Sequence, residues 1–194
     1  QPRSTARLLA DGRAPIEAIA AAVRARRVEL VVIAARGSSD HAAIYAQYLF
    51  GAFQRLPVSL ATPALTSIYG RTPKLDRALV IGISQSGRSP DIVGVVADAR
   101  AQGAVTVAIT NAADSPLAQA ADHVVDVLAG PERAVAATKS YTAQLLAVAM
   151  LATAIGGVDD PRFGADDHAR WSALAVLPGA IEAALAGEAV AVEA

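Results

Sequence analysis

Five polar side chains fall within the seven-residue stretch SQSGRSP at residues 84–90, directly after an apolar run. Three of them are serines, and Pro90 suits the first turn of a following helix. Hydroxyl groups, exposed backbone amides and the positive end of a helix dipole can together hold a phosphate dianion without a lysine. A serine-rich surface turn has the same composition. This stretch therefore leaves two interpretations open, an anion-binding loop and a solvated turn.

A second polar stretch, ARGSSD at residues 35–40, also follows an apolar run and precedes a helical pattern. Gly37 would let a ligand approach the backbone closely, and the first amides of the helix would favour an anion. The alternative is an ordinary turn from strand to helix, in which Ser39 or Asp40 caps the helix.

A third stretch, VAATK at residues 135–139, lies at the start of a long apolar helical pattern. Lys139 is unexpected at this position, since a cation near a helix N-terminus is mildly unfavourable. A lone lysine is more often a solvated charge, so Lys139 is a secondary candidate for ligand binding.

His41 stands one residue into the helix expected after the second stretch, and an imidazole can act as a proton donor or acceptor. Nothing nearby in the sequence fixes its tautomer, and polar residues are common in the first turn of a helix. We therefore leave the catalytic residues unassigned, with His41 as a candidate proton shuttle. The chain has no cysteine, and no pair of histidines or carboxylates has metal-ligand spacing, so we expect no metal.

The three stretches belong to a regular alternation of short apolar runs and helical patterns. The expected strands are 28–33, 57–60, 78–83, 104–109 and 123–127, and the expected helices are 13–26, 40–53, 90–101 and 131–155, with more helix after residue 161. Continuously apolar strands imply cover on both faces. Right-handed crossovers then give an α/β fold, a doubly wound, Rossmann-like or flavodoxin-like, parallel five-stranded sheet flanked by helices. Its ligand would bind at the carboxyl ends of the strands.

The overall composition restricts the class of partner. Lys and Arg total 17 against 18 Asp and Glu, so no field of one sign would attract nucleic acid or an anionic membrane. The longest apolar stretch, at residues 145–155, is well short of the ~20 residues that a bilayer-spanning helix needs. We expect a small-molecule partner, no nucleic acid and no membrane. The absence of cysteine is compatible with the cytoplasm, and the absence of an initiating Met predicts missing residues upstream.

Taken together, the three stretches resemble the SIS (sugar isomerase) domain family over about residues 31–155. Members of this family bind phosphosugars and include the isomerase half of glucosamine-6-phosphate synthase and related amino-sugar-phosphate deaminases. The resemblance implies that the S-Q-S-G-x-S/T loop holds the phosphate, and that the G-T/S-S loop touches both phosphate and sugar. The implied residues are Ser84, Gln85, Ser86, Gly87 and Ser89 in the first loop and Gly37, Ser38 and Ser39 in the second.

The third loop of the family reads V-A-S-T-K in the synthase, whereas this chain has Ala137 in place of the serine. One hydroxyl contact to the sugar is therefore missing. Backbone contacts from Val135 and Ala137, and a contact from Lys139, are still implied by the resemblance. The V-A-A-T-K form, and the S-P-D sequence at the end of the phosphate loop, resemble members that lack a glutamine-hydrolysing domain.

The resemblance implies the first SIS domain of an amino-sugar-phosphate isomerase or deaminase, with a glucosamine-6-phosphate or fructose-6-phosphate type of substrate and no cofactor. The catalytic Glu, His and Lys would come mostly from a second SIS domain that this chain does not contain. Residues 1–26 would be an N-terminal helical segment, 27–157 the SIS domain and 158–194 a helical linker. A homodimer is also expected, because SIS sites form where two such domains pack.

Two other interpretations stay open. SIS domains also act as phosphosugar sensors attached to regulators, where binding needs no acid/base residues. A second SIS domain beyond residue 194 would favour the enzyme, and a helix-turn-helix domain on either side would favour the sensor. A dinucleotide-binding Rossmann domain is disfavoured, because residues 35–40 supply one glycine where G-x-G-x-x-G needs three.

Overall fold

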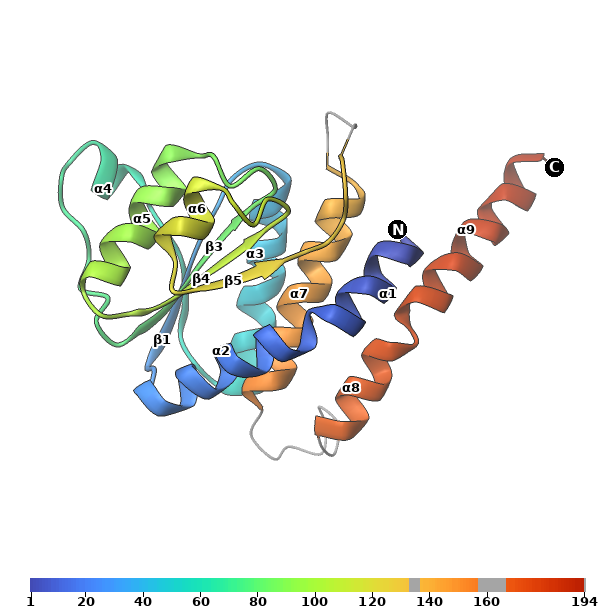
Figure 1. Ribbon diagram of the computed structural model, residues 1–194, viewed down its shortest axis with the longest axis horizontal. Helices are drawn as coiled ribbons and strands as arrows, with labels where there is room; N and C mark the ends of the chain where they lie inside the picture. Colours follow the sequence, from blue (N-terminus) through green and yellow to red (C-terminus); the bar gives the residue numbers. More distant parts are fainter. Residues whose placement is uncertain (133–136, 157–166, 194) are drawn as a thin grey trace.

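Five short runs rich in Val, Ile, Leu and Ala form strands, since their apolar side chains suit a sheet that is covered by helices on both faces. The computed structural model describes residues 1–132, 137–156 and 167–193. Its strands are β1 (Leu30–Ala35), β2 (Val58–Leu60), β3 (Ala78–Ser84), β4 (Val105–Thr110) and β5 (His123–Asp126). All pairs are parallel, in the order β2-β1-β3-β4-β5 (Figure 1). The predicted flavodoxin-like sheet is confirmed.

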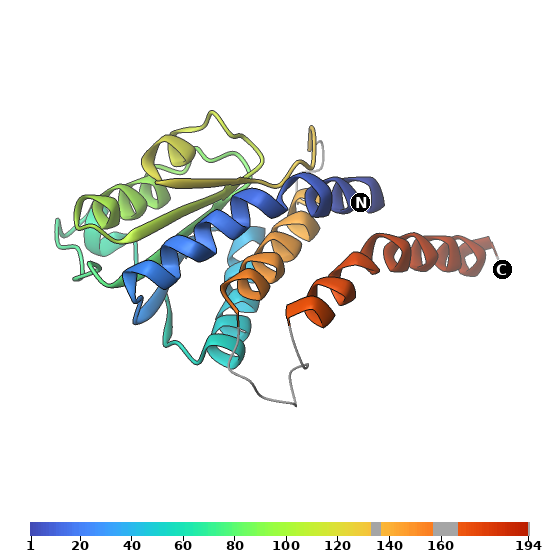
Figure 2. The same cartoon turned by 60° about the horizontal axis from the view of Figure 1, so that its bottom comes forward.

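The helices come before, between and after these strands. They are α1 (Pro2–Asp11), α2 (Arg13–Arg26), α3 (Ser38–Leu49), α4 (Ala64–Ser67), α5 (Pro90–Ala101), α6 (Pro116–Ala120), α7 (Lys139–Ile155), α8 (Asp167–Ala175) and α9 (Leu177–Glu193), with a π-helical turn, η1 (Phe50–Gln54), after α3. α9 lies against α1 and extends away from the sheet (Figure 2). Among the described residues, no helix combines the length and the apolarity needed to cross a bilayer.

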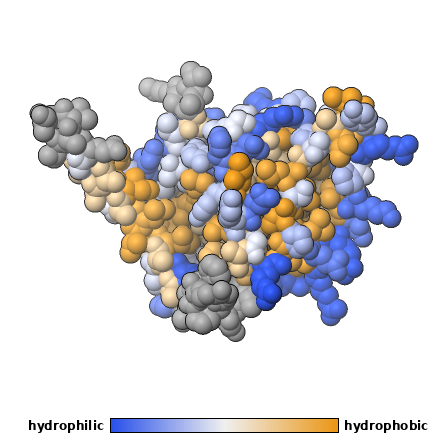
Figure 3. All heavy atoms as spheres, turned by 180° about the vertical axis from the view of Figure 1, so that it is seen from behind, coloured by the Kyte–Doolittle hydropathy of each residue, from blue (hydrophilic) through white to orange (hydrophobic). Residues whose placement is uncertain are grey.

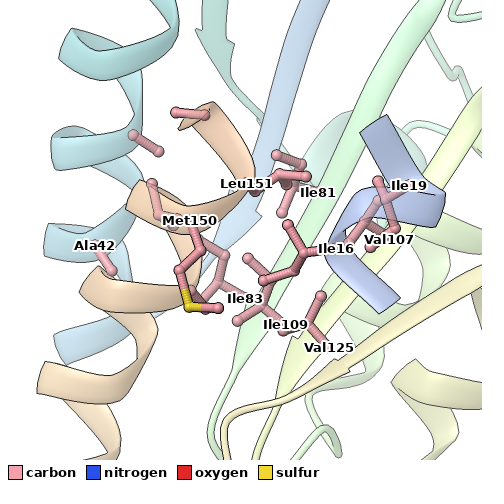
Figure 4. Close-up of a cluster of buried hydrophobic side chains, with 14 of the residues drawn as sticks. Ile16, Ile19, Ala42, Ile81, Ile83, Val107, Ile109, Val125, Met150 and Leu151 are labelled. Carbon is pink, nitrogen blue, oxygen red and sulfur yellow. The ribbon is translucent and has the colours of Figure 1, made fainter. Parts of the chain in front are cut away.

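The two faces of the sheet carry separate apolar cores. On one face, Ile81 and Ile83 pack among side chains of α2, α3 and α7 (Figure 4). On the other face, Val80 packs with Ile92 of α5 and Leu117 of α6. Successive residues of β3 thus enter opposite cores, as the alternation of side chains along a strand requires. Burial on both faces fixes the register of β3, because a shift by one residue would exchange its two sets of side chains.

The main differences from the expected elements lie in the helices. The long helix predicted from residue 131 begins at Lys139, where a carboxylate from Glu132 holds the amides of its first turn. The helix predicted at 40–53 begins at Ser38 and changes to a π-helical turn at Phe50. The short helices α4 and α6 were not predicted, since five residues or fewer give no helical periodicity.

Replacement of Ile81 by alanine tests the central position of β3. Ile81 is fully buried, so its truncation should lower the free energy of unfolding by about 2–5 kcal/mol. The matched control is Ile68→Ala, since Ile68 is 76% exposed and its truncation should change stability by about 0.5 kcal/mol or less. Urea unfolding of both variants measures the difference. Equal losses would contradict the assignment of Ile81 to the core.

Candidate functional site

The predicted loops meet at one edge of the sheet because β1 and β3 are neighbours in parallel register. Ala35 at the end of β1 pairs with Ile83, and Ser84 at the end of β3 pairs with Thr110 of β4. The connection from β1 continues outward to β2, whereas β3 lies on the other side of β1. Chain order therefore reverses between β1 and β3, which is where open α/β sheets form a ligand crevice.

The loop after β3 is closed by its own serines. The Ser84 hydroxyl, which belongs to a residue that is 8% exposed, accepts a hydrogen bond from the Gly87 amide at 3.1 Å. The Ser86 hydroxyl accepts one from the Arg88 amide at 3.4 Å, in the exposed part of the loop. A hydroxyl that accepts one hydrogen bond still has its own proton to donate. Ser84 therefore shapes the turn from below, and Ser86 lies nearer the surface that a ligand would meet.

Gly87 is required by both its backbone angle and its surroundings. Its φ is +62°, in the left-handed region that glycine adopts most easily. A Cβ atom there would lie 2.0 Å from Ser115 Oγ and 3.1 Å from Thr110 Oγ1, closer than normal contact distance. The Gly87 carbonyl also accepts a hydrogen bond from the Leu117 amide at 3.0 Å. The loop after β3 is thus packed directly onto the connection between β4 and α6.

The loop after β3 leads into α5 without a side-chain cap. Ser89 is the N-cap residue, with an extended backbone and no hydrogen bond from its side chain to the helix, and Pro90 begins the helix. One first-turn amide, that of Ile92, is bonded to the Asp91 carboxylate, whereas Ser89 leaves the helix uncapped. The helix dipole favours a negative charge at the start of α5. Gln85, Ser86 and Ser89 add further polar atoms to this loop.

The loop after β1 lies beside the loop after β3. Arg36 forms an ion pair with Asp91 in the first turn of α5, and so links the two loops. Gly37 is the N-cap of α3 with a φ of +60°, and no side chain caps this helix. In the alternative interpretation Ser39 or Asp40 would be the N-cap, but the helix starts at Ser38 and both residues lie inside its first turn. The structure therefore brings residues 37–39 to the same edge as the serine-rich loop.

The start of α7 differs from the starts of α3 and α5. α7 lies beside α3 and begins at the same end of the sheet (Figure 1). Glu132 Oε2 accepts hydrogen bonds from the Thr138 amide at 3.2 Å and from the amide and hydroxyl of Ser140, both at 3.0 Å. A carboxylate of the protein thus already occupies the positive end of α7. The N-cap residues of α3 and α5 make no such side-chain bond, although each helix has one acidic residue, Asp40 or Asp91, in its first turn.

Three of the remaining predicted site residues lie near the starts of α7 and α3. Ala137 and Lys139 are half-buried at the start of α7, and Val135 lies outside the described residues. His41 is exposed in the first turn of α3. In the described part of the chain, no three His, Asp or Glu side chains are grouped so that they could hold a metal ion.

The shifted pKa values belong to groups away from this edge. Burial raises the pKa of Tyr45, which lies halfway along α3. Burial also acts to raise the pKa of Asp122, but hydrogen bonds from Thr106 and Arg100 and the charge of Arg100 lower it overall. Asp122 directly precedes β5 and so lies at the opposite edge of the sheet. These two groups are thus part of the scaffold and do not supply acid/base chemistry to the candidate site.

A cavity of about 780 Å³ lies between α2 and α8, but its position argues against a role in this site. It is lined by Arg24, Trp171 and the end of α7 at Ile155, whereas the candidate site lies at the beginning of α7. Arg13 stacks over Trp171 in this cavity, 4.5 Å from the ring centroid. The cavity therefore lies between helices at the end of the domain opposite to the candidate site.

Sequence reasoning missed three residues that hold the site together. Thr110 and Asn111 lie at the end of β4, and the Thr110 hydroxyl and the Asn111 amide both donate to the Gln85 carbonyl, at 3.3 and 3.1 Å. Their place at the end of a buried strand was the available signal, although no motif surrounds them. The third is Glu132, which lies six residues before its partner Thr138 and outside the three stretches singled out in the sequence.

A model of the SIS domain family matches residues 26–154. The glutamine–fructose-6-phosphate aminotransferase (isomerizing) of Caldanaerobacter subterraneus is 37% identical over 127 residues, which are 65% of this chain and 21% of that protein. This chain thus spans about a fifth of the length of that curated relative.

Solved structures show the same fold. A Silicibacter pomeroyi protein described as a phosphosugar isomerase matches with a TM-score of 0.84 and 40% identity, over 92% of this chain and 52% of that one. The sugar isomerase domain of an RpiR transcription factor from Sphaerobacter thermophilus matches with a TM-score of 0.57 and 26% identity, over 81% of this chain and 83% of that one.

Replacement of Gly87 by alanine tests the packing of the loop after β3. A positive φ alone costs an alanine about 1–2 kcal/mol, and overlap with Ser115 should add about 1–3 kcal/mol. Gly103→Ala is the matched control, since Gly103 has a φ of +85° and an added Cβ atom there would meet nothing within 4 Å. Urea unfolding should show the larger loss for Gly87→Ala. Equal losses would mean that the loop moves freely away from Ser115.

Proposed function

Because this chain belongs to the SIS domain family, we propose that it binds a sugar phosphate, with the phosphate in the loop between β3 and α5. The observation that carries the proposal is the shape of residues 84–89. The loop is folded over the Ser84 hydroxyl and packed at Gly87 against Ser115, and it leads into a helix that has no side-chain cap. Such an arrangement presents hydroxyls and amides to a dianion at little cost in ordering the loop.

The residues would divide into three groups by what they touch. Gln85, Ser86 and Ser89 would bind the phosphate through side chains and amides, while Ser84 and Gly87 keep the loop in shape. Residues 37–39 would reach both phosphate and sugar, because the Arg36–Asp91 ion pair holds the two loops together. Residues 135, 137 and 139, on the third loop, would contact the sugar.

We propose further that the chain is the first SIS domain of an amino-sugar-phosphate isomerase or deaminase. The names of the aminotransferase and isomerase relatives support a hexose-6-phosphate substrate of the fructose-6-phosphate or glucosamine-6-phosphate type. The reaction would move a proton between C1 and C2 of the open-chain sugar through an enediol or enediolamine. At this edge His41 is a candidate for that step, and the Glu, His and Lys of a second SIS domain are proposed to supply most of the acid/base chemistry.

The proposed domain limits are 1–26 for an N-terminal helical segment, 27–157 for the SIS domain and 158–194 for a linker. We also propose a homodimer in the cytoplasm. Apolar side chains gather over part of the face opposite to that of Figure 1 (Figure 3), and Tyr48 on α3 is 75% exposed. Exposed apolar surface of this kind supports a contact with a second copy or a second domain.

The alternative function is a phosphosugar sensor. The observation that favours it is the match to the RpiR sugar isomerase domain, of which this chain covers 83%. A sensor would need the same phosphate loop, but no residue that moves a proton. The two functions therefore differ in chemistry and not in the binding site.

Calorimetric titration tests phosphate recognition. The chain should bind fructose-6-phosphate and glucosamine-6-phosphate but not unphosphorylated glucosamine. Ser86→Ala should weaken the binding of the phosphosugars about tenfold, which is the value of one hydrogen bond to a charged group. Ser84→Ala should also weaken it, because the loop loses the hydrogen bond from the Gly87 amide that shapes it. Ser172→Ala, at an exposed serine on α8, is the control that should leave affinity unchanged. Equal binding of glucosamine and glucosamine-6-phosphate would refute the proposed phosphate loop.

Proton exchange in D2O tests where the acid/base residues lie. An enediol intermediate would incorporate deuterium at C1 of fructose-6-phosphate, which proton NMR detects. This chain alone should bind the sugar without exchange, and a longer chain with a second SIS domain should show exchange. Exchange by this chain alone that His41→Ala abolishes would instead assign the base to α3. Binding without exchange by the longer chain would favour the sensor.

A further inference from the structure

We propose that Glu132 is a positioning residue that fixes residues 137–139 of the third loop for the sugar part of the ligand. Glu132 would thereby set the preference for a sugar phosphate over inorganic phosphate. This inference rests on the proposed function, because it concerns how the same site distinguishes two phosphate compounds. It adds a residue that none of the three sequence stretches contains.

One oxygen of Glu132 holds the start of α7. Oε2 accepts hydrogen bonds from the amides of Thr138 and Ser140 and from the Ser140 hydroxyl, at distances of 3.2, 3.0 and 3.0 Å. Ser140 is fully buried, so its hydroxyl needs this partner. Thr138, the N-cap residue, makes no capping bond with its own side chain. The cap of α7 is therefore supplied from outside the helix by a carboxylate, which gives charge-assisted hydrogen bonds.

The backbone just before Glu132 is held to the phosphate loop. The Asn111 side chain accepts from the Ala129 amide and donates to the Gly130 carbonyl, both at 2.9 Å. The Asn111 amide donates to the Gln85 carbonyl at 3.1 Å. A series of hydrogen bonds thus leads from the phosphate loop through Asn111 to residues 129–130, and from Glu132 to residues 138–140.

This arrangement separates two tasks. Ala137 and Lys139 flank Thr138, whose amide Glu132 binds, so their backbone position depends on that carboxylate. The phosphate loop depends instead on Ser84 and on the packing of Gly87 against Ser115. Loss of Glu132 should release the sugar-contacting residues and leave the phosphate loop in place.

The test compares two ligands on the 194-residue chain by calorimetry, inorganic phosphate and fructose-6-phosphate. Glu132→Ala should weaken the binding of fructose-6-phosphate about tenfold and change the affinity for inorganic phosphate less than about twofold. Glu132→Gln keeps an acceptor oxygen and should recover part of the loss. The deciding quantity is the dissociation constant for inorganic phosphate divided by that for fructose-6-phosphate, since a general loss of structure would change both constants.

Asp122→Ala is the control for stability. The Asp122 carboxylate also accepts hydrogen bonds, from the Arg100 guanidinium and the Thr106 hydroxyl, but it lies at the opposite edge of the sheet. Its loss should destabilise the fold without changing the ratio of the two constants. If Glu132→Ala does not fold, Glu132→Gln decides alone, and its ratio should still fall below that of the wild type.

The possible outcomes separate the two proposals. Parallel weakening of both ligands, or no change in either, would overturn the positioning role of Glu132 while leaving the proposed function intact. A wild-type chain that binds fructose-6-phosphate no better than inorganic phosphate would overturn the sugar-binding part of the proposed function, and this inference with it.

Discussion

The parallel, in-register pairing of β1 with β3 is the constraint on which the site depends. The two strands end at the same level because Ala35 lies opposite Ile83, so the loops that follow them start side by side. β3 is buried on both faces, and its register therefore cannot shift without exchanging the side chains that enter the two cores. Buried side chains such as Ile81, which lie away from the site, therefore fix the position of the serine-rich loop.

Polar contacts between the loops that follow the strands then join these loops into one unit. The Gln85 carbonyl accepts a hydrogen bond from the Asn111 amide, and Arg36 forms an ion pair with Asp91. Glu132 caps α7. Each of these contacts joins segments that follow different strands or precede different helices. α3, α5 and α7 all start at this edge, and the protein neutralises the dipole of α7 itself. The start of α7 is thus less available to an anion than the starts of α3 and α5, whose N-cap residues make no side-chain bond to the helix.

Much of the fold and part of the site could be predicted from the sequence. The strands were recognisable because buried parallel strands are continuously apolar, and Pro90 correctly marked the start of α5. The start of α7 could not be predicted, since the alanines before Lys139 have high helix propensity and only the folded chain brings Glu132 to the amides of residues 138 and 140. The roles of Thr110 and Asn111 were hidden for the same reason, because their partner Gln85 is distant in sequence.

The contact between Gly87 and Ser115 has a consequence for how such a site can diversify. There is no room for even a methyl group between these two residues, so a side chain at residue 87 would require a change at Ser115 as well. The start of α7 is instead connected to these loops by side chains, which can be exchanged one at a time. Changes in ligand preference should therefore come more easily from substitutions at the start of α7 than from substitutions at Gly87 in the phosphate loop.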